Sequence, residues 1–221
     1  MDLLVVGLGN PGAEFDGTRH NIGADAVACL VARHHGSLSA EKGLQARAGQ
    51  VLIAGRRVLC AVPLTYMNES GLAVAALVRR AGIEGTGEAD APDGAGTDRA
   101  GADGAGERGV GGTGVATRLV IVHDELDLPS GRVKVKVGGG TAGNNGLKSI
   151  HAHLHTGDYL RIRIGIGKPP GRQPGADYVL KRPGSAEREV LAVAAEVAAD
   201  AVELIVTVGV ETAMNRINTA E

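Results

Sequence analysis

The sequence predicts an α/β protein: a single three-layer α/β/α domain built around a mixed, mostly parallel central sheet. Short apolar runs alternate along its 221 residues with longer stretches of helical periodicity. The runs Leu3–Val6 and Leu119–Val122 are apolar at every position, which is typical of strands covered by helices on both faces. Residues 131–137 and 159–166 instead alternate basic with apolar side chains, so one face of each of these strands meets solvent or a ligand.

The predicted elements alternate between strands and helices along the chain. The first helix rests on Ile22, Ala26 and Leu30, which recur at helical spacing, and two later helices each follow a polar turn that contains an asparagine. In chain order the elements are strand 2–7, helix 21–35, strand 45–53, strand 57–62, helix 69–83, strand 118–123, strand 131–137, helix 146–155, strand 159–166, helix 186–207 and a short helix 209–217.

Residues 85–117 interrupt this pattern. The segment consists almost entirely of Gly, Ala, Asp, Glu, Thr and Arg, with Val110 and Val115 as its only larger apolar residues. Such a composition cannot bury enough surface to offset the entropy of ordering, so we interpret 85–117 as a disordered insertion within one domain, 1–221. The alternative is a domain boundary, but the motifs on its two sides combine into one site.

Composition excludes several classes of protein. No apolar run approaches the roughly 20 residues of a membrane span, and the first residues do not resemble a secretion signal. Cys29 and Cys60 fall in apolar runs, which favours buried thiols over a disulfide or a metal site and indicates a reducing cytoplasm. We therefore expect a cytoplasmic protein that does not bind membranes.

The net charge of −2 conceals a separation of charge along the chain. Residues 118–182 contain eleven Lys or Arg against five acids, whereas the insertion and the segment 183–221 are both acidic. Positive charge is thus concentrated in the segment that holds the alternating basic strands. This is the distribution expected of a surface that binds a phosphate backbone, although solvated charge alone could also produce it.

The opening motif presents an asparagine and a histidine. The spacing of Gly7, Gly9 and Gly12 after a strand matches a dinucleotide-binding fingerprint. That fingerprint requires a helix to begin within the turn, whereas the residues after Pro11 have no apolar helical stripe. We therefore interpret the turn as a polar loop that brings Asn10 and His20 together.

Four further blocks carry polar side chains at the ends of predicted elements. Residues 143–149 resemble a phosphate-binding loop but lack its Gly-Lys-Ser/Thr ending, because Leu147 separates Gly146 from Lys148. The blocks are Pro63–Gly71, His123–Gly131, Gly138–Ser149 and Arg161–Gly167. Together with the opening motif, and in this order, they resemble the bacterial-type peptidyl-tRNA hydrolases, over residues 1 to about 84 and about 118 to 217.

The resemblance implies an α/β fold and an enzyme that cleaves the ester between a peptide and tRNA without a cofactor or metal. It implies His20 as general base on water, Asp124 as the acid that orients it, and Asn10 beside the scissile bond. His20 suits this role because imidazole titrates near working pH. Spacing alone does not select Asp124 over Glu125 or Asp127. No nucleophile elbow is present, which favours direct attack by water.

Substrate contacts also follow from the resemblance. Asn68 and Asn145 are expected to hold the peptide and stabilise the oxyanion, with Phe15 and Tyr66 as apolar walls or core residues. Lys136 and Arg163, with Lys134 and Lys148 as neighbours, are expected to bind a tRNA phosphate. The expected partner is peptidyl-tRNA, with no obligate protein partner and a monomeric chain.

Two features depart from the family pattern and two functional alternatives remain. The first is the glycine-rich loop, where the family usually has a histidine at the position of Asn144 and where Ala142 is also unusual. The second is the long acidic insertion. The acids Asp124, Glu125 and Asp127 could instead bind Mg²⁺ in a phosphoester or nucleotide hydrolase. The other alternative is a tRNA- or ribosome-binding module without catalysis. The presence of His20 together with an orienting acid argues against it, because a binding module needs no base. The alternating histidines His151, His153 and His155 are interpreted as a solvated helix face.

Overall fold

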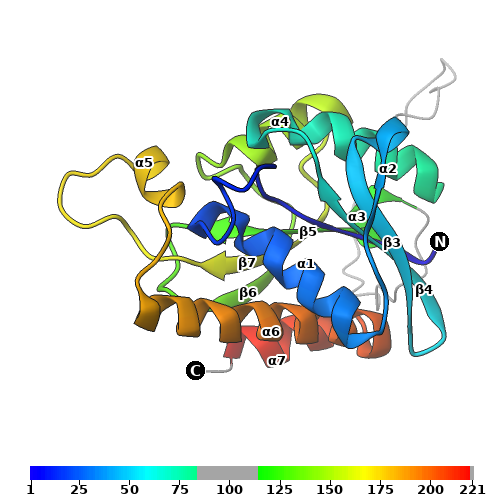
Figure 1. Ribbon diagram of the computed structural model, residues 1–221. Helices are drawn as coiled ribbons and strands as arrows, with labels where there is room; N and C mark the ends of the chain where they lie inside the picture. Colours follow the sequence, from blue (N-terminus) through cyan, green and yellow to red (C-terminus); the bar gives the residue numbers. More distant parts are fainter. Residues whose placement is uncertain (84–113, 220–221) are drawn as a thin grey trace, which may run out of the picture.

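The computed structural model describes residues 1–83 and 114–219, which form a seven-stranded sheet between two layers of helices (Figure 1). The strand order is β2-β3-β4-β1-β5-β7-β6. The strands are β1 (Leu3–Gly7), β2 (Ser39–Glu41), β3 (Ala46–Ile53), β4 (Arg56–Pro63), β5 (Leu119–Glu125), β6 (Val133–Val137) and β7 (Leu160–Gly165).

The sheet is mixed in the way the sequence predicts. Strands β4, β1, β5 and β7 pair in parallel at its centre, whereas β3 and β6 run antiparallel to their neighbours. The central strands β1 and β5 are buried at every residue, as their unbroken apolar runs require. Because the carboxyl ends of parallel strands meet at one edge, the segments after β1 and β5 emerge side by side.

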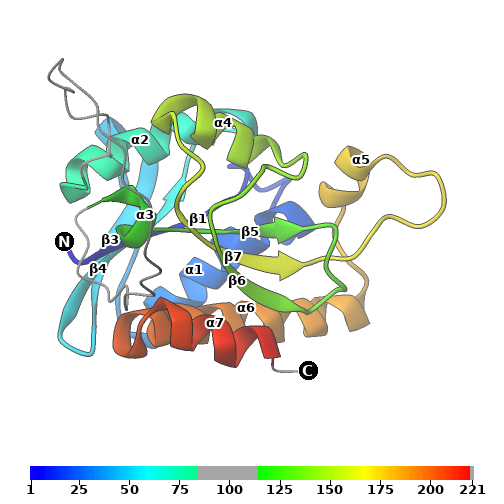
Figure 2. The same cartoon turned by 180° about the vertical axis from the view of Figure 1, so that it is seen from behind.

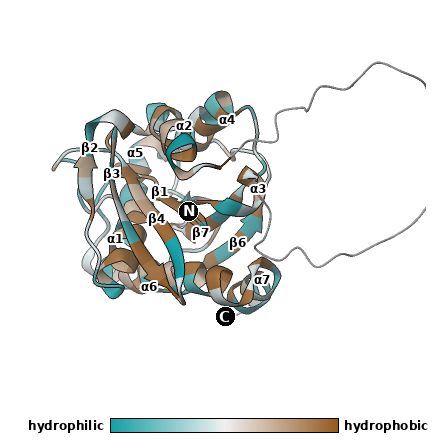
Figure 3. Cartoon of the chain, turned by 90° about the vertical axis from the view of Figure 1, so that its right-hand side faces the viewer, coloured by the Kyte–Doolittle hydropathy of each residue, from teal (hydrophilic) through white to brown (hydrophobic). Residues whose placement is uncertain are grey.

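The helices divide between the two faces of the sheet (Figures 1 and 2). Helices α2 and α4 cover one face over Leu4, Val6 and Ile121, and α1, α6 and α7 cover the other over Val5, Val122 and Ile162. Brown and teal bands alternate along the helices in Figure 3, and the buried core is built largely from apolar residues. The helices are α1 (Ile22–Arg33), α2 (Ser70–Ala81), α3 (Val115–Arg118), α4 (Asn145–Leu154), α5 (Gly175–Val179), α6 (Ser185–Val208) and α7 (Val210–Thr219).

The sequence analysis missed several short elements. Strand β2 and helix α5, together with the 3₁₀ helices η1 (Arg19–Asn21), η2 (Lys42–Leu44) and η3 (Met67–Glu69), were not predicted. The predicted disordered insertion also ends too late, because Val115–Arg118 form α3 and the Val115 side chain packs into the α2/α4 core. The rest of that segment, up to residue 113, lies outside the described residues.

Helix α1 begins in direct backbone contact with the sheet. A Cβ atom on Gly23 would lie 2.3 Å from the Val122 carbonyl oxygen, and one on Gly7 would lie 2.2 Å from the Gly23 carbonyl oxygen. The Ala24 amide donates to the Leu8 carbonyl oxygen, and the Leu8 amide donates to that of Val122. These contacts fix the start of α1 against the ends of β1 and β5.

We predict that Gly23→Ala lowers the free energy of unfolding by about 2 kcal/mol or more, because the added methyl group must displace α1 from the backbone of β5. Urea unfolding measures the loss. Gly43→Ala is the matched control, since a Cβ atom there meets no atom within 4 Å. Equal stability of the two variants would show that α1 can shift without cost.

Candidate active site

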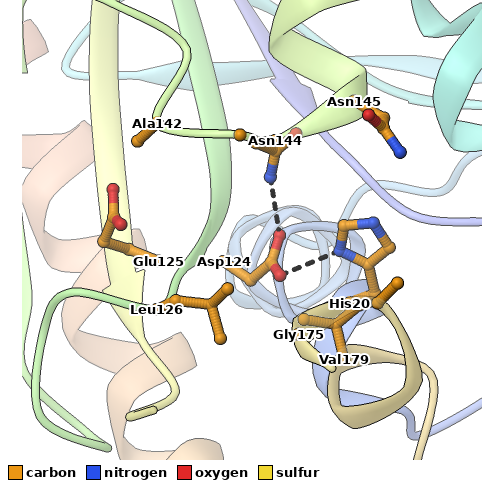
Figure 4. Close-up of a pocket in the computed structure, with 11 residues that line it drawn as sticks. His20, Asp124, Glu125, Leu126, Ala142, Asn144, Asn145, Gly175 and Val179 are labelled. Carbon is orange, nitrogen blue, oxygen red and sulfur yellow. Dashed lines mark hydrogen bonds and ion pairs between the residues drawn. The ribbon is translucent and has the colours of Figure 1, made fainter. Parts of the chain in front are cut away.

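A pocket of about 230 Å³ opens at the carboxyl end of β5 (Figure 4). Three segments build it: η1 through His20, the end of β5, and the loop that leads into α4. Helix α5 closes a further side through Gly175 and Val179. The polar groups that converge on the pocket are His20, Asp124, Glu125, Asn144 and Asn145.

His20 and Asp124 form the central contact of the pocket. The His20 Nδ1 atom lies 2.8 Å from Asp124 Oδ2, and both side chains are largely buried. Because a carboxylate only accepts, Nδ1 carries a proton, and in the neutral form of the ring Nε2 keeps a free lone pair. The Nε2 atom points away from Asp124, on the side of the pocket where Asn145 lies (Figure 4). This arrangement leaves an imidazole base facing the pocket.

The second carboxylate oxygen of Asp124 has its own donor. Asn144 Nδ2 donates to Asp124 Oδ1 at 3.0 Å. The Asn144 side-chain oxygen accepts from the amides of Gly146 at 2.9 Å and Leu147 at 3.2 Å, which makes Asn144 the N-cap of α4. Sequence reasoning noted Asn144 only as a departure and did not assign it to the site. The position of Asn144 directly before a predicted helix could have indicated the cap. No feature of the sequence indicated its contact with Asp124.

The other two acids of the predicted cluster have separate partners. Glu125 Oε2 pairs with Arg163 Nη2 at 2.9 Å, and Glu125 Oε1 accepts from the Asp127 amide. Asp127 is exposed and pairs with Lys168 at 3.1 Å. Among residues 1–83 and 114–219, no group of three or more His, Cys, Asp or Glu side chains is placed to hold a metal ion.

Asn10 lies at the edge of the site and lines a neighbouring groove rather than the pocket. The side chain of Asn21 holds it by accepting from the Asn10 amide at 2.9 Å and donating to its carbonyl oxygen at 3.0 Å. The Asn10 side-chain oxygen accepts from the Met67 amide at 2.7 Å. The Asn10 NH₂ group has no hydrogen-bond partner among the described residues, and Asn21 is a supporting residue that sequence reasoning missed.

The remaining predicted substrate residues lie on exposed segments. Asn68 in η3 and Asn145 at the start of α4 are both exposed, and only Asn145 lines the pocket. Phe15 and Tyr66 meet edge to face with ring centroids 6.3 Å apart, and Tyr66 is 54% exposed. The pair therefore forms a surface wall rather than part of the core.

The predicted phosphate-binding cations lie on the α2/α4 face of the sheet. Lys134 pairs in register with Arg163, and Lys136 with Arg161, so all four residues share one face. Lys136 and Lys148 are exposed, Lys134 is half-buried, and Arg163 is held by Glu125. Arg161 is buried and donates to the carbonyl oxygens of Gly139 and Gly140, so it holds the glycine-rich loop instead of facing solvent.

Arg19 fixes the residue before His20. Its guanidinium pairs with both carboxylate oxygens of Glu187 at 2.8 and 2.6 Å and lies 4.1 Å from the centre of the Tyr178 ring. The Tyr178 hydroxyl donates to the Ile166 carbonyl oxygen. These contacts join η1 to α5 and α6, so the wall of the pocket formed by α5 is connected to the histidine.

The family model for peptidyl-tRNA hydrolase matches residues 4–86 and 114–221. The chain belongs to the peptidyl-tRNA hydrolase family. The stretch that the family model leaves out, 87–113, falls within the low-complexity insertion.

Individual relatives in the peptidyl-tRNA hydrolase family are similar over almost the whole chain. The peptidyl-tRNA hydrolase of Cutibacterium acnes is 41% identical, with 97% of each chain covered, and that of Nocardia farcinica is 44% identical, with 97% of this chain and 95% of the relative covered. The crystal structure of peptidyl-tRNA hydrolase from Acinetobacter baumannii matches with a TM-score of 0.80 at 32% identity, covering 99% of this chain and 95% of that one. Within the described part of the chain, no helix is long and apolar enough to cross a membrane.

His123 directly precedes Asp124 but cannot serve as a base in the pocket of this hydrolase. Its ring is buried among the strands, and Nδ1 donates to the Asp124 carbonyl oxygen at 2.7 Å. Burial lowers the pKa of His123, because the charged imidazolium would lose its hydration, and Arg161 adds a smaller effect in the same direction. Folded His123 is therefore harder to protonate than a histidine of the unfolded chain, although Asp124 and Glu125 partly oppose the effect of burial.

This depressed pKa predicts a loss of stability on acidification. Below about pH 6.5 the unfolded chain protonates this histidine more readily than the folded chain does, so the free energy of unfolding falls as the pH is lowered. We expect His123→Asn, which keeps a donor near the Nδ1 position, to reduce the difference in stability between pH 7.5 and pH 5.5. Urea unfolding at the two pH values measures it, and an unchanged difference would assign the acid sensitivity to other groups.

Proposed function

We propose that the chain hydrolyses the ester between peptide and tRNA in peptidyl-tRNA, releasing free tRNA for translation. The observation that carries the proposal is the buried His20–Asp124 pair, which presents Nε2 to a pocket lined by asparagines within a chain of the peptidyl-tRNA hydrolase family. The expected setting is the cytoplasm, with the chain acting as a monomer and without a cofactor or metal.

His20 acts as the general base in this reaction. It takes a proton from water through Nε2 while the water oxygen attacks the ester carbonyl carbon, and the imidazolium is stabilised by Asp124. The tetrahedral intermediate collapses by breaking the bond to the ribose oxygen, which receives the proton from His20. The products are a peptide carboxylic acid and tRNA with a free ribose hydroxyl.

The asparagines supply neutral donors to the reacting ester. Asn10 offers its NH₂ group because its oxygen is bound by Met67, and Asn145 extends from the pocket wall opposite Asp124. Asn68 is expected to contact the peptide from η3, beside the wall formed by Phe15 and Tyr66. Donors of this kind stabilise the oxyanion that develops on the carbonyl oxygen.

Lys136, Lys134 and Lys148 form an exposed basic surface suited to the tRNA phosphates. Arg163 joins them on the same face, with its guanidinium oriented by Glu125. Glu125 connects this surface to the pocket, because it pairs with Arg163 and also lines the pocket. One ligand can thus contact the basic strands and the pocket together.

Two substrates test the activity itself. The purified chain is incubated with an N-acetylated aminoacyl-tRNA and, separately, with the unblocked aminoacyl-tRNA. We expect rapid release of the amino acid from the blocked substrate only, at the same rate with and without EDTA. Activity that disappears in EDTA and returns with Mg²⁺ would favour the metal-dependent alternative, and binding without hydrolysis would favour a tRNA-binding module.

The role of His20 is tested by His20→Ala. We expect kcat to fall by about 10²–10⁴-fold while KM changes little, because the imidazole acts in the transition state and contributes little to tRNA binding. The control is His153→Ala, which removes an exposed histidine of α4 outside the pocket. A fall of less than tenfold in kcat would remove His20 from the proton transfer.

The phosphate surface is tested most cleanly at Lys136. We expect Lys136→Ala to raise KM much more than it lowers kcat, because a phosphate bound equally in ground and transition states contributes uniform binding. The dependence of log(kcat/KM) on log(salt) should also flatten by about one unit.

Arg163→Ala alone is a poorer test, because it leaves Glu125, which is 5% exposed, without its cation. The combined Arg163→Ala and Glu125→Gln change avoids this problem. Arg216→Ala, on exposed α7 in the opposite layer, serves as control for a lost positive charge. A salt dependence that matches the parent after Lys136→Ala would place the phosphate elsewhere.

A further inference from the structure

Asn144 connects two structures that the sequence analysis treated separately: the N-terminus of α4 and the carboxylate of Asp124 (Figure 4). We infer that Asn144 is a positioning residue for the reaction, which fixes the Asp124 carboxylate so that His20 presents Nε2 to the substrate. The inference rests on the proposed function, since it assigns a role within the same site.

The orientation of the Asn144 amide follows from its partners. Its oxygen accepts from two backbone amides, Gly146 and Leu147, and neither of these could bond to an NH₂ group. The NH₂ group must therefore face Asp124 Oδ1, which can only accept. The cap thus determines which end of the side chain meets the acid.

The backbone around Asn144 also restricts its movement. The Asn144 amide donates to the Thr141 carbonyl oxygen at 2.9 Å, and the Asn144 carbonyl oxygen accepts from Lys148 at 3.1 Å. Between Thr141 and Asn144, Ala142 and Gly143 both have positive φ, as in a tight type I′ turn. Turn, cap and first helical bond together hold the side chain in one place.

Two fixed donors define the plane of the Asp124 carboxylate. His20 Nδ1 binds Oδ2 and Asn144 Nδ2 binds Oδ1, so rotation of the carboxylate would weaken both hydrogen bonds. Without Asn144, Oδ1 loses its donor from the protein in a site where Asp124 is only 4% exposed. The carboxylate is then free to turn, which weakens the hydrogen bond between Asp124 Oδ2 and His20 Nδ1.

Two substitutions separate this role from helix capping. Asn144→Ser keeps a side-chain oxygen that can accept from Gly146 and Leu147, but it is too short to donate to Asp124. Asn144→Ala removes both the cap and the donor. We expect both variants to lower kcat by about five- to thirtyfold with less than a twofold change in KM, whereas only Asn144→Ala lowers the unfolding midpoint, by a few degrees.

The pH profile gives a readout that a capping role alone would not change. With the carboxylate free to turn, Asp124 stabilises the protonated His20 ring less well, so the acidic limb of kcat/KM should move to lower pH in both variants. Wild-type kcat and an unshifted limb in Asn144→Ser, with losses in Asn144→Ala alone, would overturn the inference and leave Asn144 as a cap.

A substrate-free measurement distinguishes failure of the inference from failure of the proposed function. The His20 ring is titrated by NMR in the parent chain and in Asn144→Ser, with His20→Ala used to assign its signal. We expect the titration midpoint to move in the same direction as the acidic limb. If the parent chain does not hydrolyse the blocked aminoacyl-tRNA, the proposed function fails, and the NMR midpoint still decides whether Asn144 acts on the pair.

Discussion

The close approach of α1 to the sheet is the constraint on which the site depends. His20 lies three residues before Gly23, and Asp124 lies two residues after Val122, whose carbonyl oxygen would meet a Cβ atom on Gly23 at 2.3 Å. The hydrogen bond of 2.8 Å between His20 and Asp124 therefore spans two elements whose separation is set by backbone contact, not by flexible side chains. A hydrogen bond weakens over a few tenths of an ångström, so a rigid contact of this kind is what keeps the pair formed in the free enzyme.

In the segment 118–182, several arginines make structural contacts, whereas the lysines of β6 and α4 lie on the surface. Arg161 is buried against the glycine-rich loop, Arg163 is paired with Glu125, and Arg132 donates to the Asn218 carbonyl oxygen in α7. The planar guanidinium suits these roles because it satisfies several acceptors at fixed angles. The exposed charge on the β6 and α4 surface is carried instead by lysines, whose hydrated ammonium groups attract phosphates over a distance at little cost in desolvation. The positive segment in the sequence is thus only partly available to a ligand.

The elements that the sequence predicted correctly are those whose pattern is repeated over many residues. The six longer strands and five longer helices were found because an apolar run, a strict alternation or helical spacing extends over each of them. Strand β2 has three residues and no apolar run, and α5 is a single turn held by contacts between Tyr178, Arg19 and Ile166 that no local pattern reveals. The helix at Val115 was assigned to the insertion because its composition is that of the insertion, whereas its order comes from burial of Val115. The spacing of residues in the sequence does not predict long-range contacts of this type. The contact of Asn144 with Asp124 is another example.

Strand alternation explains a choice that spacing left open among three acids. Asp124 has the same parity as Val120 and Val122, which face α1, whereas Glu125 has the parity of Ile121, which faces α2 and α4. Asp124 is therefore the acid that can meet His20 at the start of α1. Their partners complete the distinction: Glu125 and Asp127 are neutralised by Arg163 and Lys168, but Asp124 is bound by a neutral amide and by the imidazole itself. Because no cation is bonded to Asp124 within the described residues, its charge is available, in the mechanism that we propose, to stabilise the imidazolium that would form when His20 accepts a proton from water.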